Sequence, residues 1–377
     1  MPIDPFEMER MQSLYWHRVE YDLSESGVTP LRIAELLDGT ALDPETFLQT
    51  ELGYPLSEGS DATRAAIAAW YPGAEIANVT VVNGGSEANF LSLWTLLDRG
   101  FRLAFMVPNY MEGWGLGRFF ADGTDTFSLR LSDDAGRWFL DADELAAAVT
   151  DRTRVVMVCN PNNPTGHVLT EGEMDVIVAA ADRVGAWIVA DEIYRGAEVE
   201  TDEASPTFWG RSDRVVCTSG LSKAFGMPGL RIGWAVGPVA FINDFWAHHD
   251  YTTLTPSMVS DRLCAIAMEP VTRERILART REIIRRQLPR LEEWILARDD
   301  VFRYARPKAG AIAYAVYDLP VRSRALIDRI REEQSVLLVP GEVFGIGDGI
   351  RFGFGYDIEH TMQGLARVDG TLDALRT

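Results

Sequence analysis

Short apolar runs alternate with longer amphipathic stretches between about residues 60 and 265. The runs are rich in Val and Ile, as buried strands are, whereas the stretches repeat their apolar residues every three to four positions, as helices do. This alternation predicts an α/β fold in which helices flank a mostly parallel sheet. The expected strands are Val79–Val82, Leu103–Val107, Val155–Val158, Trp187–Ala190 and Val215–Thr218, and two of the expected helices are Ser86–Leu97 and Glu171–Val184.

The remaining chain predicts a smaller α+β domain. Pro270–Ala297 has the pattern of a long charged helix, Ala311–Tyr317 alternates like a strand, and Ser323–Gln334 has the pattern of a further helix. The turn-rich segment before residue 45 cannot form a core by itself, so we expect it to pack against the C-terminal part. We therefore predict a large domain at 46–265 and a discontinuous small domain made of 1–45 and 266–377.

Composition and charge narrow the classes of protein. The 377 residues are 47% hydrophobic, enough for a large core, and they carry a formal net charge of −20. A negative field of this size repels nucleic acids and anionic membrane surfaces, so neither is an expected partner. No apolar run reaches the length of a membrane span and the start does not resemble a signal peptide, which predicts a cytoplasmic protein. The three scattered cysteines and the absence of metal-ligand spacings predict reduced thiols and no metal site.

The candidate chemistry follows the predicted strands, because ligands of open parallel sheets bind at the carboxyl ends of the strands. After the first strand comes NGGSE at residues 83–87, where glycines and a helix start can direct backbone N–H groups toward a phosphate. A plain turn with a serine helix cap would have the same sequence. Residues 159–166, CNPNNPTG, form a proline-restrained loop with exposed amides, which is typical of binding loops.

Two further strand ends carry ionisable residues. Asp191 follows the fourth strand with Tyr194 three residues later, although a helix cap or a surface acid is an alternative for Asp191. Lys223 follows the last strand, among Gly, Phe, Met and Pro residues. We expect partial burial there to lower the pKa of its amine and to favour Schiff-base chemistry.

The order of these motifs, NPNNPTG, then DEIY, then SKAFGMPGLRIGW, resembles the class I and II aminotransferases, a group of fold-type I pyridoxal-phosphate enzymes, over nearly the full chain. The resemblance implies a mostly parallel seven-stranded sheet in the large domain and pyridoxal 5′-phosphate (PLP) as cofactor. It also implies an enzyme that moves the amino group of an L-amino acid to a 2-oxo acid.

The resemblance assigns catalytic and cofactor roles to particular residues. Lys223 matches the lysine that forms the Schiff base with PLP, and Asp191 the carboxylate that keeps the ring nitrogen protonated. Tyr194 and Asn163 match the pair that hydrogen-bonds the ring's phenolic oxygen. The positions that match phosphate contacts are Gly85, Ser86, Ser222 and Arg231. Tyr110 matches the aromatic residue stacked on the ring, although core packing alone would also explain it.

Other matches concern the substrate and a second subunit. Arg351 resembles the arginine that clamps the substrate's α-carboxylate, with Gly27 opposite and Asn163 nearby, although a structural ion pair is an alternative for Arg351. Tyr54 resembles the tyrosine that reaches the phosphate in the other subunit, which implies a homodimer with shared active sites.

The sequence also departs from the family pattern. Gly220 stands where many members carry a hydroxyl residue that contacts the phosphate. Residues 24–28, SESGV, instead resemble the corresponding segment of capreomycidine synthases, family members that cyclise their substrate. We hypothesise that Glu25 faces a polar or cationic substrate side chain. His248 and His249 add polar groups of unknown direction, and they are more often surface residues than acids or bases.

Two alternatives to transamination remain open at this point. The first is PLP-dependent β- or γ-elimination, replacement or cyclisation in specialised metabolism, which uses the same cofactor residues. The second is a non-catalytic PLP-binding regulator, although such regulators usually carry a basic winged-helix module that this chain does not display.

Overall fold

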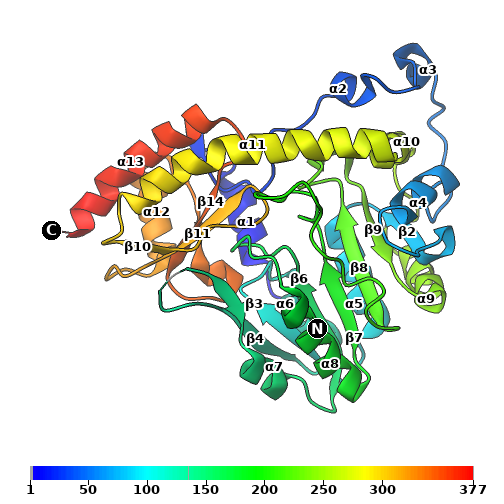
Figure 1. The fold of residues 1–377 in the computed structure, drawn as a ribbon, viewed down its shortest axis with the longest axis horizontal. Coiled ribbons are helices and arrows are strands. Elements are labelled where there is room, and N and C mark those ends of the chain that lie inside the picture. Colours follow the sequence, from blue (N-terminus) through cyan, green and yellow to red (C-terminus); the bar gives the residue numbers. More distant parts are fainter. Residues whose placement is uncertain (1–2, 135, 377) are drawn as a thin grey trace.

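The structure is a computed structural model that describes residues 3–134 and 136–376, and its centre is a twisted sheet flanked by helices (Figure 1). Within the described residues this sheet has eight strands, in the order β2 (Val79–Val82), β9 (Gly233–Val236), β8 (Val215–Gly220), β7 (Trp187–Asp191), β6 (Thr153–Cys159), β3 (Arg102–Val107), β4 (Thr124–Leu131) and β5 (Trp138–Leu140). β9 and β5 run antiparallel to their neighbours and the other six strands run in one direction. The α/β class is confirmed, and the short hairpin strand β5 extends the expected seven strands to eight.

Each face of the sheet contributes to a different hydrophobic core, because side chains alternate along a strand. Leu103 and Phe105 of β3 join one core, whereas Ala104 and Met106 join the other. The helices with residues in the first core are α5 (Gly85–Leu96), α6 (Glu112–Phe120) and α9 (Val239–His249). Those with residues in the second include α4 (Asp61–Ala68), α7 (Ala142–Ala148), α8 (Glu171–Val184), α10 (Met258–Met268) and α11 (Pro270–Leu296).

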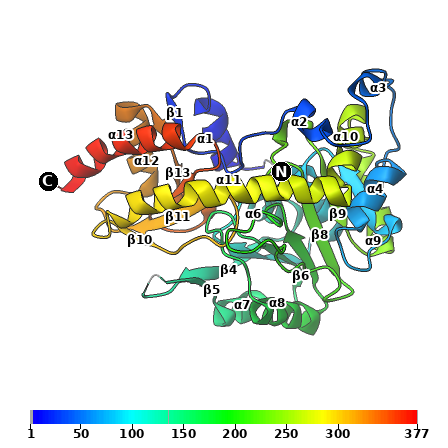
Figure 2. The ribbon, with the colours of Figure 1, turned by 45° about the horizontal axis from the view of Figure 1, so that its top comes forward.

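Two smaller sheets combine the N-terminal segment with the C-terminal part. One pairs β1 (Tyr21–Asp22) with β12 (Val336–Leu337), and the other has the order β10 (Phe302–Tyr304), β11 (Ile312–Tyr317), β14 (Gly349–Gly353) and β13 (Val339–Pro340). α12 (Ser323–Gln334) and α13 (Ile358–Arg376) accompany these sheets, and the long helix α11 runs beside both parts of the molecule (Figure 2). The division at residues 45 and 265 stays a prediction, and the β1–β12 pairing is consistent with it.

Three short helices precede α4 in the N-terminal segment. They are α1 (Glu7–Tyr15), α2 (Ile33–Leu37) and α3 (Pro44–Leu48). α1 lies between the small sheets and the large one (Figure 1), and three of its residues, Met8, Met11 and Gln12, are buried. In the part of the chain that is described, no helix combines the length and apolar character that crossing a bilayer requires.

Local signals set several boundaries where the sequence predicted them. α8 begins after Thr170, whose hydroxyl accepts a hydrogen bond from the backbone of Glu173 while the Glu173 carboxylate bonds back to the cap. It ends at Gly185, which adopts the left-handed conformation that favours glycine. Strand β9 was not predicted. Its four residues follow a loop, so they lack the preceding helical pattern by which the other strands of the alternating α/β region were recognised.

Candidate active site

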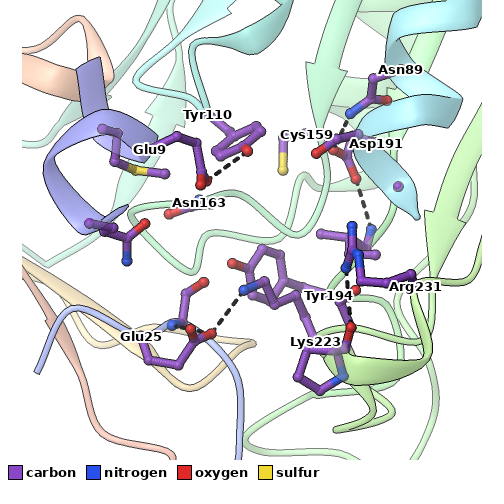
Figure 3. Close-up of a pocket in the computed structure, with 18 of the residues that line it drawn as sticks. Glu9, Glu25, Asn89, Tyr110, Cys159, Asn163, Asp191, Tyr194, Lys223 and Arg231 are labelled. Atoms are coloured by element: carbon purple, nitrogen blue, oxygen red, sulfur yellow. Dashed lines mark hydrogen bonds and ion pairs between the residues drawn. The ribbon is translucent and has the colours of Figure 1, made fainter. Parts of the chain in front are cut away.

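A cavity of about 510 Å³ lies at the carboxyl ends of the central strands, where the sequence predicted a ligand site (Figure 3). Ten predicted site residues line it, namely Glu25, Gly85, Ser86, Tyr110, Asn163, Asp191, Tyr194, Ser222, Lys223 and Arg231. Glu9 and Glu25 lie at one side of the cavity and Asp191 and Arg231 at the opposite side, with Lys223 between them. The fold therefore brings together residues that lie far apart in the sequence, up to 223 positions for Met8 and Arg231.

Lys223 is paired with Glu25 in the cavity. Lys223 Nζ donates to Glu25 Oε1 at 2.9 Å, and the same oxygen accepts from the backbone N–H groups of Ser26 and Gly27 at 2.9 and 3.0 Å. Burial is the largest influence and lowers the pKa of Lys223, but the charge of Glu25, the nearby Tyr194 phenol and the hydrogen bond to Glu25 together outweigh burial, so the net pKa is raised. The predicted lowering of the lysine pKa is therefore wrong for this state, because the sequence did not reveal that Glu25 is its partner.

The pKa of Glu25 shifts in the opposite direction. Burial raises it, but the Lys223 ammonium and the backbone donors outweigh burial and lower it. Gly27 does not line the cavity, yet a Cβ at this position would lie 3.4 Å from Glu25 Oε1. Gly27 therefore lies directly behind the Glu25 carboxylate, close to the expected substrate region.

Asp191 is held by neighbours that the sequence analysis missed. Asn89 Nδ2 donates to Asp191 Oδ2 at 2.9 Å, and the backbone N–H of Ile193 donates to Oδ1 at 3.0 Å. Burial raises the pKa of Asp191, while these two donors act to lower it. Asn89 follows Ser86 by three residues in α5, so its helical spacing was the signal that could have placed it beside the cavity.

The predicted phosphate turn is built by close backbone packing. Gly84 has φ of 107°, and a Cβ there would come 2.4 Å from Arg231 Nη2. A Cβ on Gly233 of β9 would come 2.3 Å from the carbonyl carbon of Gly84. Because these positions are glycines, the N-terminus of α5, the Arg231 guanidinium and β9 can approach one another closely. Backbone N–H groups therefore lie beside a positive charge.

The departure at Gly220 also has a steric explanation. A Cβ on Gly220 would lie 2.6 Å from the carbonyl oxygen of Ile232. A hydroxyl residue at this position would therefore require the backbone of β8 or β9 to shift.

Tyr110 lies at the far wall of the cavity, against the N-terminal helix. Its hydroxyl donates to Glu9 Oε1 at 2.8 Å, and its ring packs edge-on against Phe6 with centroids 4.7 Å apart. Burial, followed by nearby carboxylates, raises the pKa of the phenol well above its usual value.

The α1 residues that line the cavity are Met8, Glu9, Gln12 and, just after the helix, Trp16. None was predicted, although three of them recur at helical spacing in the sequence.

Arg351 lies next to the cavity but does not line it. It is 1% exposed, and its Nη1 donates to Asn163 Oδ1 at 3.0 Å while Nη2 donates to the carbonyl of Ser24. Its Nε is buried without a hydrogen-bond partner, and burial lowers the pKa of the guanidinium. Among the described residues it forms no ion pair within 4 Å, so the alternative of a structural ion pair has no support in the contacts of Arg351.

The predicted subunit-crossing residue and the two histidines lie elsewhere. Tyr54 is 85% exposed and borders a surface groove that also includes Asn83 and Thr253. Neither His248 nor His249 lines the cavity. His249 is fully buried rather than at the surface, because its ring bonds the Thr253 hydroxyl in the loop after α9 at 3.0 Å and lies 3.9 Å from the Glu87 carboxylate in the first turn of α5.

Residues 44–368 match the family described as aminotransferase class I and II. The chain therefore belongs to this family, as its fold and the residues of its cavity indicate, and it is an enzyme of this class. This makes the hypothesis of a non-catalytic regulator unnecessary.

Particular relatives carry out more than one reaction. The capreomycidine synthase of Streptomyces vinaceus is 30% identical over 373 residues, which cover 95% of this chain and 92% of that protein. A PLP-dependent aminotransferase from Streptococcus suis superposes with a TM-score of 0.91 at 26% identity and covers 100% of this chain and 99% of its own. The PLP-dependent cyclase OrfR has a TM-score of 0.86 at 28% identity and covers 100% of this chain and 98% of its own. Transamination and cyclisation are therefore both represented among proteins similar to this chain.

The family and these neighbours imply PLP, and the residues present fit it. The turn at Gly84 and Gly233 has no room for side chains and presents N–H groups beside Arg231, which suits a phosphate. An amine, Lys223, and a buried carboxylate, Asp191, lie in the same cavity, which suits an aldehyde and a pyridine nitrogen.

Proposed function

We propose that this chain binds PLP at Lys223 and transfers the amino group of an L-amino acid to a 2-oxo acid. The observation that carries the proposal is the common cavity of Lys223, Asp191, Asn163 and Tyr194, with Arg231 at the phosphate turn. Each of these residue types has a separate chemical task in amino-group transfer, and family membership supports the same activity.

The cofactor supplies an aldehyde that accepts the substrate's amino group and a ring that takes up electrons from the substrate's Cα. Lys223 Nζ would bind that aldehyde and, once released, would carry a proton to and from the substrate's Cα. Asp191 would keep a proton on the ring nitrogen, because a nearby anion raises the pKa of a base. Asn163 and Tyr194 would bond the ring's phenolic oxygen, and Tyr110 would pack on the ring.

The phosphate would be bound by four groups at one end of the cavity. The backbone N–H groups of Gly85 and Ser86 lie at the N-terminus of α5, where the helix dipole favours an anion. The Ser222 hydroxyl would add a donor, and the Arg231 guanidinium would add a fixed positive charge.

The substrate's α-carboxylate would be bound by Arg351 with the backbone of Gly27. Support comes from the unpartnered Nε of Arg351 and from its buried charge, which faces amide and carbonyl oxygens rather than a carboxylate. A substrate carboxylate would compensate this charge and could accept two parallel hydrogen bonds. Asn163, already bonded to Arg351, would hold the guanidinium in place.

A half-reaction tests the proposal. Holoenzyme mixed with single L-amino acids, without any oxo acid, should lose the visible absorbance of bound PLP and yield pyridoxamine phosphate and the matching 2-oxo acid by mass. Lys223→Ala should block the conversion. Unchanged absorbance across all standard amino acids would contradict the proposal.

A second candidate is elimination or cyclisation at the substrate's side chain. The observation that favours it is the Glu25 carboxylate, 2.9 Å from Lys223 Nζ, where it could take a proton from the Lys223 ammonium and deliver it to a departing side-chain group. The likeness to capreomycidine synthase and to a PLP-dependent cyclase adds support. A cyclised or eliminated product formed without an oxo acid would favour this reaction, whereas strict dependence on an oxo-acid acceptor would exclude it.

We further propose a homodimer with shared active sites in the cytoplasm. Tyr54 is 85% exposed and does not line the cavity of its own chain, so it is free to reach a second copy. The three cysteines are all free and buried, which suits a reducing compartment. The net charge of −20 argues against nucleic acid or an anionic membrane as a partner.

A further inference from the structure

The start of helix α5, at the phosphate turn, has N–H groups without acceptors. Its cap residue is Gly84, which has no side chain that could bond to them. The backbone N–H of Gly84 itself donates to the carbonyl of Val82 at 3.0 Å, whereas those of Gly85, Ser86 and Glu87 have no acceptor among the described residues. Most helices satisfy such groups with a capping side chain. At the start of α5 they stay available to an external anion.

Glu87 lies in the first turn of α5, but its carboxylate is bonded elsewhere and does not line the cavity. Its Oε2 accepts from the backbone N–H of Asn83 at 2.7 Å. In a capping box, the third helical residue accepts from the cap residue itself. Glu87 is that third residue, and it bonds instead to the residue before the cap. It therefore closes the turn at Gly84 and leaves the N–H groups of the helix start uncovered.

Two threonines in the loop after α9 hold the Glu87 carboxylate. Thr252 Oγ1 donates to Oε1 at 2.7 Å, and Thr253 Oγ1 lies 2.9 Å from both oxygens. Thr253 has a single hydrogen to donate, so its oxygen accepts from Asn83 Nδ2 at 2.7 Å and from His249 Nε2 at 3.0 Å. Burial lowers the pKa of His249, which keeps the ring neutral with its proton on Nε2. The segment whose histidines had no assigned direction therefore supports Glu87.

The charge of Glu87 cannot be what it contributes to phosphate binding. Like charges repel, so a carboxylate beside the phosphate turn opposes the binding of an anion. Among the described residues the one basic group within 4 Å of Glu87 is the His249 ring, at 3.9 Å, and this ring is neutral. The hydrogen bonds of Glu87 fix the conformation of the turn, and this is the contribution that remains.

We infer that Glu87 is a positioning residue for the cofactor's phosphate. This rests on the proposed function, in which the N–H groups of Gly85 and Ser86 bind the phosphate of PLP. Glu87 does not touch the phosphate. It fixes the N–H of Asn83, and with it the glycine turn, so that the N–H groups of the helix start stay directed at the anion.

Equilibrium binding of PLP and of pyridoxal, which lacks the phosphate, to the full chain tests the inference. Glu87→Ala should reduce the preference for PLP over pyridoxal by about tenfold or more, because the Asn83 N–H loses a charged acceptor. Glu87→Gln should restore the preference. Its amide oxygen can accept from Asn83 and Thr253, and its amide N–H can donate to Thr252. The Thr252 hydrogen then goes to the His249 carbonyl, 3.2 Å away.

A control and a milder variant complete the experiment. Glu144→Ala changes the same third position of another helix, α7, where the side chain pairs with Arg130, and it should leave the preference for PLP unchanged. Thr252→Val removes one donor to Glu87 and should reduce the preference by about twofold to tenfold, which tests the inference even if Glu87→Ala does not fold.

The outcomes separate this inference from the proposed function. An unchanged preference in Glu87→Ala and Thr252→Val, or an equal loss in Glu87→Ala and Glu87→Gln, would overturn the inference and leave the proposed function standing. An equal loss of affinity for PLP and pyridoxal in Glu87→Ala would also overturn it, because the variant would then disturb the whole cavity. A wild-type chain without any preference for PLP would instead contradict the proposed phosphate site.

Discussion

At the scale of single residues, a hydrogen-bond chain across three elements fixes the carboxylate of Asp191. Thr218 Oγ1 on β8 donates to Asn89 Oδ1 on α5 at 2.6 Å, and Asn89 Nδ2 donates to Asp191 on β7 at 2.9 Å. The Thr218 hydroxyl fixes the orientation of the Asn89 amide, so its N–H group must face Asp191. Because burial raises the pKa of Asp191, this donor is needed to keep the carboxylate anionic and correctly oriented.

Replacement of Asn89 by alanine should lower the affinity for PLP more than the loss of one small amide group suggests. The variant leaves the buried Asp191 carboxylate without its side-chain donor, which costs about 1–3 kcal/mol for an unsatisfied buried group. We expect PLP affinity, measured by fluorescence titration, to fall by about five-fold to 150-fold. Thr218→Val, which removes only the group that orients Asn89, should have a smaller effect. Equal effects of the two variants would contradict the role of the amide.

The Glu25–Lys223 pair predicts a pH-dependent capture of the cofactor by the cofactor-free protein. The pKa of Lys223 is raised by Glu25, so the amine is protonated and unreactive over a wider range below that pKa. In Glu25→Gln the charge of Glu25 is lost, whereas burial, the largest influence, still lowers the pKa against the smaller raising effect of Tyr194. The variant should therefore bond added PLP faster at neutral pH, by about tenfold for each unit by which the pKa falls. Stopped-flow absorbance against pH would measure this, and superimposable profiles would refute it.

At the scale of elements, the start of α5 and strand β9 form the phosphate turn by backbone contact. β2 pairs with β9 in antiparallel register, with Val82 opposite Gly233, so β9 passes directly under residues 84 and 85. A side chain on β9 at this point would displace the turn rather than a flexible neighbour. The geometry of the start of α5 at Gly85 therefore depends on a strand that begins at Gly233, 148 residues later in the sequence.

Gly233→Ala should impair recognition of the phosphate selectively. Its Cβ would lie 2.3 Å from the Gly84 carbonyl carbon, and such overpacking typically costs about 1–3 kcal/mol. Affinity for PLP should fall, whereas affinity for pyridoxal, which has no phosphate, should change little. Gly172→Ala, where nothing lies within 4 Å, is the matched control. An equal loss for both ligands would mean that the variant disturbs the whole cavity.

At the scale of the whole molecule, residues from both parts of the chain form the active site. Outside this site, Tyr54 is exposed and could contact a second copy of the chain. Glu9 and Glu25 come from the N-terminal segment, which pairs with the C-terminal part through β1 and β12. They meet Lys223 of the large sheet in one cavity. Tyr54 lies outside that cavity, in a groove that includes Asn83, directly before the phosphate turn. The groove is thus placed where a second subunit could approach the cofactor region.

Mixed dimers should reveal the shared site. Lys223→Ala lacks the amine, and Tyr54→Ala lacks the proposed phosphate contact from the partner. A mixed dimer would contain one intact site, with Lys223 from one variant and Tyr54 from the other. Subunit exchange should therefore raise activity above the sum of the two separate preparations. No gain on mixing, with a monomer by sedimentation at the same concentration, would contradict the proposed dimer.

The candidate site could be predicted in part because its motifs follow strand ends. Asn163, Asp191 and Lys223 lie where the carboxyl-end rule expected them, and all three line the cavity. Asn89 and Glu9 were missed, since neither stands in a loop after a predicted strand. Arg351 lies behind Asn163 rather than in the cavity wall, a position that depends on the register of β14 against β11.

The sequence by itself determined the features that depend on neighbours along the chain. The alternation of strands and helices, the caps of α8 and the glycine turn before α5 arise from periodicity, hydrogen-bonding side chains and backbone freedom within a few residues. Only the tertiary structure decided that Glu25 pairs with Lys223, that Asn89 holds Asp191 and that α1 forms a cavity wall. Such contacts join residues 101 to 198 positions apart, and local patterns carry no information on which side chains folding brings together. The pKa of Lys223 is the clearest case, because burial lowers it while the distant Glu25 and Tyr194 together raise it, and only the fold brings these groups around the amine.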